Sequence, residues 1–226
     1  MAYDYLGITN DVAGRLNETA LTTSNFATVT GFYAAIKEAV NSSIRHINQS
    51  HFSWPFNWNS EELTLEAGVT RYAVPAEAKY VDFDTFRVKR DTTLNLGRAR
   101  KLRKITYVEY VDRYIDQEDE TDTAKGGVPE YVFRSQDGYF GITPMPDKAY
   151  TVEYEYFLHP VNLSLFDDVP SIPEPYKHVI VDGAMYYCYM FRDNMEMASI
   201  SKNKFDEGMK NMRKILVNEN YYVRAT

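Results

Sequence analysis

Apolar residues recur at helical spacing between Gly31 and Ser50. Positions three and four residues apart form one stripe, which comprises Phe32, Ile36, Ala39, Val40, Ile44 and Ile47. This spacing predicts an amphipathic helix with one buried face. A shorter helix is predicted from Asp11 to Glu18, with Asn10 as its N-cap residue. The polar segment 21–30 between the two helices is predicted to be a connector.

The pattern changes to a two-residue alternation after Trp54-Pro55, because the residue before a proline is disfavoured in a helix. Leu63 and Leu65 alternate with polar neighbours, and a turn signal at Ala67-Gly68 leads to Tyr72 and Val74, which predicts a hairpin. Further strands are predicted at 80–89, 98–105, 130–134, 139–143 and 150–158, with a short helix at 107–115. Short strands separated by regular turn signals indicate an antiparallel sheet or a small sandwich.

Helical spacing returns after a segment that contains Pro170, Pro173 and Pro175. Two stripes follow, separated by a break at 192–194; they comprise Val179, Ile180, Ala184, Tyr187, Cys188 and Phe191, and then Ala198, Phe205, Met209, Met212 and Leu216. Two helices joined by a short connection form an antiparallel hairpin. The chain is therefore predicted to be an α+β protein. Residues 1–60 and 174–226 would form a helical bundle with a C-terminal tail, and residues 61–173 a β-rich antiparallel insert domain.

Composition excludes several classes of protein. The 226-residue chain carries 25 Lys and Arg against 32 Asp and Glu, a formal net charge of −7, which argues against electrostatic attraction to nucleic acid as its main activity. A single cysteine excludes an internal disulfide and a cysteine-based zinc site. No signal-peptide pattern or membrane-length apolar run is present, so we expect a soluble protein without a membrane partner. The 19 tyrosines suit protein interfaces.

The sequence contains no recognisable catalytic motif. Phosphate-binding loops, dinucleotide-binding glycine motifs, nucleophile elbows and zinc-protease motifs are all absent, and His46 and His51 lie five residues apart, off the spacing that places two ligands on one helix face. We therefore expect no enzymatic activity, no cofactor and no metal. Cys188 lies within an apolar stripe and is interpreted as a core residue. The methionines of the last two helices are interpreted as packing residues, with an adaptable protein interface as the alternative.

Two adjacent segments of opposite charge are candidates for docking. The first, Arg87 to Lys104, is basic apart from Asp91; it can be a solvated hairpin, a surface that docks onto an acidic partner, or a contact for DNA phosphates. The second is acidic, and its part from Asp116 to Asp122 is predicted to be a solvated, mobile loop. Such blocks can pair between copies of one chain, and heterologous contacts can close into rings. The residues assigned to subunit or partner docking are Arg98, Arg100, Lys101, Arg103, Asp116, Glu118, Asp119 and Glu120.

The C-terminal segment after Leu216 carries two tyrosines and an arginine, residue types that are enriched at interface hot spots. It is either a frayed terminus or a segment that becomes ordered on a partner.

Several stretches, taken in their order along the chain, carry a resemblance to a known family. They are residues 22–27, 40–45, 54–58, 63–65 with Gly68, 72–75, 82–86, 141–147, Tyr150, 154–156, Pro173-Glu174 and 198–213. In this order they resemble the head-to-tail adaptor proteins of tailed bacteriophages, and the podophage tail tubular protein A class in particular. The resemblance spans nearly the whole chain and rests on structural signatures, not catalytic ones.

The resemblance implies a structural virion protein at the head–tail junction, present in the host cytoplasm during assembly. Such adaptors form a homo-oligomeric ring, typically of twelve copies, that binds the portal protein, helps close the filled capsid and connects it to a tail or nozzle protein. Genomic DNA passes through the channel without sequence-specific binding. The portal contact falls on the C-terminal extension, here Leu216, Tyr221, Tyr222 and Arg224. The alternative function is a nucleic-acid-binding module that uses the basic block 87–104.

Overall fold

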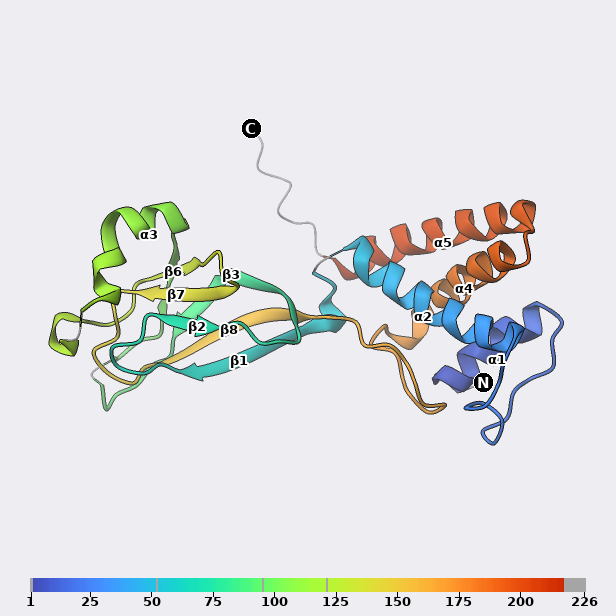
Figure 1. The fold of residues 1–226 in the computed structure, drawn as a ribbon, viewed down its shortest axis with the longest axis horizontal. Helices are drawn as coiled ribbons and strands as arrows, with labels where there is room; N and C mark the ends of the chain where they lie inside the picture. Colours follow the sequence, from blue (N-terminus) through green and yellow to red (C-terminus); the bar gives the residue numbers. More distant parts are fainter. Residues whose placement is uncertain (1, 52, 95, 121, 218–226) are drawn as a thin grey trace. The chain divides into compact units, whose positions relative to one another are not determined.

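The computed structural model describes residues 2–51, 53–94, 96–120 and 122–217. Its helices and strands confirm the α+β class (Figure 1). The chain divides into two compact units, Met1–Asn57 with His159–Thr226 and Trp58–Leu158, which we call the helical unit and the β unit. The second boundary falls before the proline-bounded segment 159–173, which the sequence pattern assigned to the insert.

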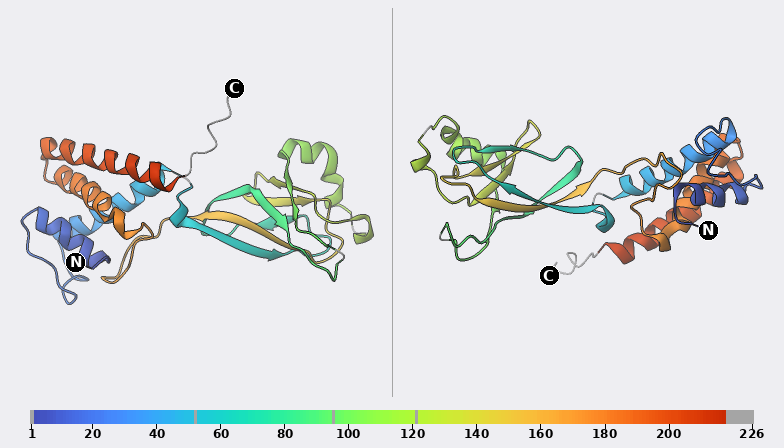
Figure 2. Two further views of the ribbon diagram at one scale, coloured as in Figure 1. Left: turned by 180° about the vertical axis from the view of Figure 1, so that it is seen from behind. Right: turned by 90° about the horizontal axis from the view of Figure 1, so that it is seen from below.

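The described part of the helical unit contains four α-helices, which are α1 (Tyr5–Arg15), α2 (Phe32–Ser50), α4 (Lys177–Phe191) and α5 (Met195–Leu216). Helix α4 packs against α2 and α5, and α1 packs against α2 and α4 (Figure 2). The stripe of α2 points into this core, with Ile36, Val40 and Ile47 fully buried. Burial of such a stripe supplies most of the stability of a helix in a folded protein.

The predicted start of the first helix is wrong. Helix α1 begins at Tyr5 because Asp4, not Asn10, caps it: the Asp4 carboxylate accepts a hydrogen bond from Gly7 N–H at 2.6 Å. Asn10 instead holds the connector, since its side chain exchanges two hydrogen bonds with the backbone of Leu21. The hydrogen-bond acceptor in the side chain of Asn10 was therefore not sufficient to identify the N-cap of α1.

Helices α2 and α4 approach each other closely at Ser43 and Gly183. A Cβ atom placed on Gly183 would lie 2.2 Å from Ser43 Oγ and 2.7 Å from the ring of Phe205. Among the residues that the structure describes, the buried Ser43 hydroxyl has no hydrogen-bond partner. The absence of a side chain at position 183 thus allows the two helix backbones to pack together.

The β unit is a sandwich of two four-stranded sheets. One sheet has the order β1 (Trp58–Thr64), β8 (Thr151–Leu158), β3 (Ala78–Val88), β4 (Arg100–Lys101); the other has the order β2 (Arg71–Ala73), β7 (Tyr139–Thr143), β6 (Tyr131–Arg134), β5 (Arg103–Lys104). All pairs are antiparallel except β5 with β6. The Phe86 ring stacks on Tyr154 and meets Phe140 edge-on, with ring centres 4.6 and 5.1 Å apart. These rings from both sheets form one shared core.

Two strand predictions are wrong for the same physical reason. The segments on either side of Gly68 do not form a hairpin, because β1 pairs with β8 and β2 pairs with β7 in the other sheet. The predicted strand 98–105 is likewise divided into β4, which pairs with β3, and β5, which pairs with β6. Leu102 is buried between the two pieces. In both places the chain changes sheets.

The short helix α3 (Tyr107–Tyr114) covers the second sheet beside β6 (Figure 1). The Thr106 hydroxyl caps it by accepting a hydrogen bond from Glu109 N–H at 3.2 Å. On its inner face the buried Tyr110 ring stacks on Phe133, with ring centres 3.8 Å apart. The helix thereby closes a small third core.

Candidate interaction surfaces

Part of the basic block 87–104 is neutralised by the acids of its own unit. Arg87 pairs with Glu153 at 2.8 Å and Lys89 pairs with Glu62 at 2.6 Å. Arg87 and Glu153 are cross-strand neighbours of β3 and β8, so the block supports sheet pairing as well as carrying charge. The field that the block presents to a partner is weaker than its composition indicates.

The four basic residues assigned to docking are all exposed. Arg100, Lys101 and Arg103 line one shallow pocket of about 260 Å³ together with Pro129 and Glu130. Arg100 and Glu130 lie 3.9 Å apart there. Arg98 is not among the residues that line this pocket.

The acidic segment is tied to the sheet, unlike the mobile loop that the composition predicts. The Glu118 carboxylate accepts hydrogen bonds from Arg71 Nε at 2.6 Å and from the Tyr110 hydroxyl at 2.8 Å. The Gln117 side-chain oxygen accepts from the Thr143 hydroxyl and from Met145 N–H, both at 3.0 Å. These contacts hold residues 117 and 118 to two different strands and to α3.

The four acidic docking residues therefore divide into two classes. Glu118 is engaged with Arg71, and Glu120 pairs with Lys125 at 2.5 Å. Asp116 and Asp119 are exposed and form no ion pair within the described ranges. Only the second class is free to meet a partner without breaking a contact inside the β unit.

A second pocket of the β unit was not predicted from the sequence. It has a volume of about 200 Å³ and is lined by Val74, Ala78, Lys79, Tyr80, Val81, Phe83, Lys104, Arg134, Gly138 and Tyr139. We call it the cationic pocket, because its three charged residues are all basic. Burial lowers the pKa of Lys79, and Lys104 Nζ lies 5.9 Å from the centre of the Phe83 ring. Neither Lys104 nor Arg134 has an acidic partner in the described part of the chain.

The helical unit exposes an apolar loop at residues 161–169. Val161 is 82% exposed, Leu165 and Val169 are each 62% exposed, and Phe166 is 40% exposed. The loop is nevertheless held in shape, because the Asp168 carboxylate accepts hydrogen bonds from Ser164 N–H at 2.6 Å and Leu165 N–H at 2.8 Å. These hydrogen bonds lower the pKa of Asp168. Contiguous exposed apolar side chains are typical of interaction sites.

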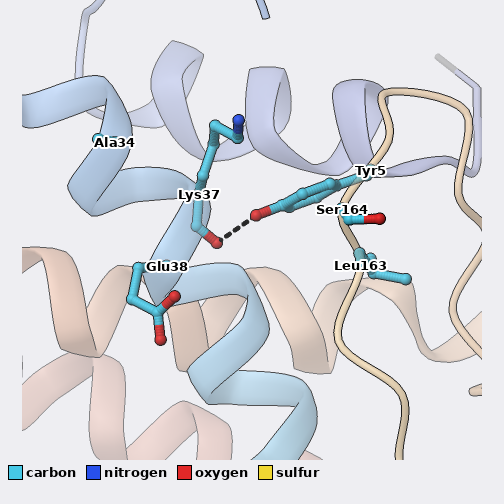
Figure 3. A pocket seen from close by; sticks show the side chains of 6 residues that line it. All are labelled: Tyr5, Ala34, Lys37, Glu38, Leu163 and Ser164. Carbon is cyan, nitrogen blue, oxygen red and sulfur yellow. Dashed lines mark hydrogen bonds between the residues drawn. The ribbon is translucent and has the colours of Figure 1, made fainter. Parts of the chain in front are cut away.

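The base of this loop is fixed to α1 and α2 by a buried amide. The Asn41 side chain accepts from Leu163 N–H at 2.9 Å, and donates to the Leu163 carbonyl at 3.0 Å and to the Tyr5 hydroxyl at 3.1 Å. The Tyr5 hydroxyl donates to the Lys37 carbonyl at 2.9 Å, at the edge of a pocket that Leu163 and Ser164 also line (Figure 3). The loop is thus a firmly anchored part of the helical unit.

A second apolar patch lies where α4 and α5 are joined. Its exposed members are Met190, Phe191, Met195, Met197 and Ile200. Phe191 packs on Phe32, and the Arg192 guanidinium lies 3.8 Å from the centre of the same Phe32 ring. The packing interpretation of the methionines holds for the buried Met185 and Met212, whereas three others lie on the surface. Flexible, polarisable methionine side chains suit an adaptable protein contact.

The described residues contain no constellation for catalysis. Cys188 is 1% exposed, and burial raises the pKa of its thiol to about 12, so it is not an activated nucleophile. His46 Nδ1 lies 3.0 Å from the Tyr187 hydroxyl, a contact inside the bundle. A search of the described residues found no group of three His, Cys, Asp or Glu that could bind a metal. It also found no helix with the length and hydropathy of a membrane span.

Only one residue of the expected portal contact is described. Leu216 is half-buried and is the last residue of α5. Tyr221, Tyr222 and Arg224 lie outside the described residues.

The comparison with protein families gives one result for the whole chain. A family model described as SU10 adaptor protein matches residues 3–225. The match covers the helical unit and the β unit together. A search of curated proteins found no match, and neither result bears on the more specific likeness to the podophage tail tubular protein A class.

Proposed function

Because the chain belongs to the SU10 adaptor protein family, a family of structural phage proteins, we propose that it is a head-to-tail adaptor that forms a ring below the portal. In this role it helps close the DNA-filled capsid and connects it to a tail or nozzle protein. We propose twelve copies per ring, as the resemblance implies. The location is the virion, after assembly in the host cytoplasm.

The family match over residues 3–225 is the observation that carries this proposal. The described surfaces support it, because a ring subunit between two neighbouring assemblies needs several separate contact surfaces. The helical unit exposes the apolar loop and the patch around Met195, and the β unit exposes the cationic pocket and the carboxylates of Asp116 and Asp119. We assign the portal contact to Leu216 and the segment that follows it.

The charge of the chain is compatible with DNA passage. A net charge of −7 gives little long-range attraction to phosphate. Arg87 and Lys89 are moreover paired with acids of their own sheet. A ring with few free phosphate contacts would let DNA pass without holding it.

Electron microscopy of phage particles tests the proposal. Particles that contain the protein should show a ring directly below the portal, and particles made without it should be filled heads that lack tails and leak DNA. Supplying the gene on a plasmid should restore tailed particles. Density on the capsid surface or in the tail fibres would contradict the proposal.

The alternative is a nucleic-acid-binding module built on the block 87–104, which the exposure of Arg98, Lys101 and Arg103 favours. Such a module should lose affinity for DNA steeply between about 50 and 200 mM salt. The adaptor proposal predicts no appreciable binding at either salt concentration. Fluorescence anisotropy with labelled duplex DNA distinguishes the two.

A further inference from the structure

Helix α3 presents two valines to solvent. Val108 is 66% exposed and Val111 is 37% exposed, and with Asp112 they follow the i, i+3, i+4 spacing that places side chains on one helix face. Valine is a poorer helix former than alanine, lysine or glutamate, and these two are far from buried. Within a single chain this face therefore adds little stability to the helix.

Negative charge lies beside these valines. Asp112 is on the same face of α3, and Asp116 lies in the 3-10 turn Ile115–Glu118 that directly follows the helix; both are exposed and form no ion pair within the described residues. The one cation of the helix, Arg113, is engaged with Glu109 at 3.1 Å. The valines of α3 are thus followed by two carboxylates that form no ion pair in the described part of the chain.

The cationic pocket is complementary to α3 in charge and is also partly apolar. Val74, Val81 and Phe83 give it apolar walls, and Lys104 and Arg134 contribute positive charges that have no acidic partner among the described residues. None of the described residues that line it is an acid. The exposed rings of Tyr80 and Tyr139 add amphipathic area of the kind that is enriched at protein interfaces.

One copy cannot bring these two surfaces together. Tyr110, on the opposite face of α3, is buried against Phe133 of β6. Val108 and Val111 are exposed on the part of α3 that does not pack against β6. A second copy can supply the missing partner.

We propose that the cationic pocket of one copy binds the outer face of α3 of a second copy, with Val108 and Val111 against the apolar walls and Asp112 and Asp116 beside Lys104 and Arg134. This inference rests on the proposed function, in which copies of the chain form a ring. Two different surfaces meet in this contact, so it is heterologous and propagates from copy to copy until the ring closes. The paired charges fix the register of the contact.

Charge reversal tests the contact. Lys104→Glu with Arg134→Glu, or Asp112→Lys with Asp116→Lys, should each weaken ring formation at least about tenfold, since like charges would face each other. All four substitutions in one chain should restore it, because the charges are then complementary again. Lys148→Glu with Lys204→Glu is the matched control, with the same change in net charge at exposed positions outside the pocket. Ring formation is measured by sedimentation and by electron microscopy.

Equal loss in the control, or no rescue by the fourfold variant, would overturn the contact. If the pocket instead holds DNA phosphates, the first pair of substitutions would weaken DNA binding and the second pair would not restore it. That result would also overturn the proposal.

Crosslinking gives an independent readout in the assembled ring. Chains carrying Val111→Cys are mixed with chains carrying Tyr139→Cys and treated with oxidised glutathione. A covalent dimer should form in the mixture and in neither variant alone, while the buried Cys188 stays reduced. Rings below the portal without this crosslink would refute the contact and leave the proposed function intact; absence of the protein from the head–tail junction would refute the proposed function itself.

Discussion

The buried hydroxyl of Ser43, in the core of the helical unit, has no hydrogen-bond partner within the described ranges of the chain. Burial removes it from water and no hydrogen bond compensates, so Ser43→Ala should raise the free energy of unfolding by about 1 kcal/mol. Urea denaturation followed by circular dichroism measures the change. A loss of stability would show that the hydroxyl has a partner in solution.

Substitution of Gly183 should lower the free energy of unfolding. A methyl group there would meet Ser43 Oγ and the Phe205 ring, so Gly183→Ala should destabilise the protein by about 1–3 kcal/mol. Gly14 of α1 is the matched control, because a Cβ atom there meets nothing within 4 Å. Gly14→Ala should stabilise by about 0.5–1 kcal/mol, through the lower flexibility of the unfolded chain.

At the scale of elements, Arg71 is the residue that joins the acidic segment to β2. Arg71→Ala removes its contacts with Glu118 and Asp137, and backbone hydrogen exchange in residues 115–120 should become at least about tenfold faster. Arg87→Ala is the control, since its partner Glu153 lies on β8. Unchanged exchange in 115–120 would mean that the contacts of Gln117 and the hydrogen bond from Tyr110 to Glu118 hold the segment without Arg71.

The apolar loop should be sensitive to acid. Hydrogen bonds from Ser164 and Leu165 lower the pKa of Asp168 below its value in the unfolded chain. Their contribution to the stability of the loop is therefore fully present above the unfolded pKa of about 4, and it is lost as the pH falls through the pKa of the folded protein. Hydrogen exchange of residues 164–168 should accelerate in that range. In Asp168→Asn the exchange should be fast already at neutral pH and independent of pH after correction for the intrinsic rate.

The helices were more predictable than the strands. Stripes and breaks are local signals, and they predicted α2, α4 and α5 to within about three residues. Strand pairing depends on residues that are distant in the sequence. Tyr72 pairs with Phe140, and at the buried Leu102 the chain passes from one sheet to the other. The cationic pocket was missed for the same reason, since residues 79, 104, 134 and 139 meet only after the sheets have formed. The two charge blocks could be identified from the sequence. The sequence did not show which of their charges form ion pairs within the β unit.

At the scale of the whole molecule, tyrosine burial predicts sensitivity to alkali. Burial and the hydrogen bond to Asp147 raise the pKa of Tyr150 to about 12, and burial also raises the pKa of Tyr154 and Tyr5. A tyrosine whose pKa is higher in the folded protein than in the unfolded chain stabilises the fold at pH values below its unfolded pKa of about 10. This stabilisation is lost as the pH rises through the pKa of the folded protein. The free energy of unfolding should therefore fall above about pH 10.

Replacing a buried tyrosine should weaken this dependence. Tyr150→Phe removes one ionisable group, so the fall in stability with alkali should be shallower. Tyr139→Phe, at a residue that is 44% exposed, is the comparison and should leave the slope nearly unchanged. Equal slopes in the wild type and Tyr150→Phe would contradict the assignment.

The edges of the two sheets have a consequence for the protein before it is assembled. Three of the four edge strands, β2, β4 and β5, are only two or three residues long, and the longer β1 carries Glu61 and Glu62. Short or charged edges leave little unpaired backbone on which a strand of another chain could add. Addition of a strand from another chain at these edges is therefore disfavoured, which lowers the tendency of the free protein to form fibres at high concentration.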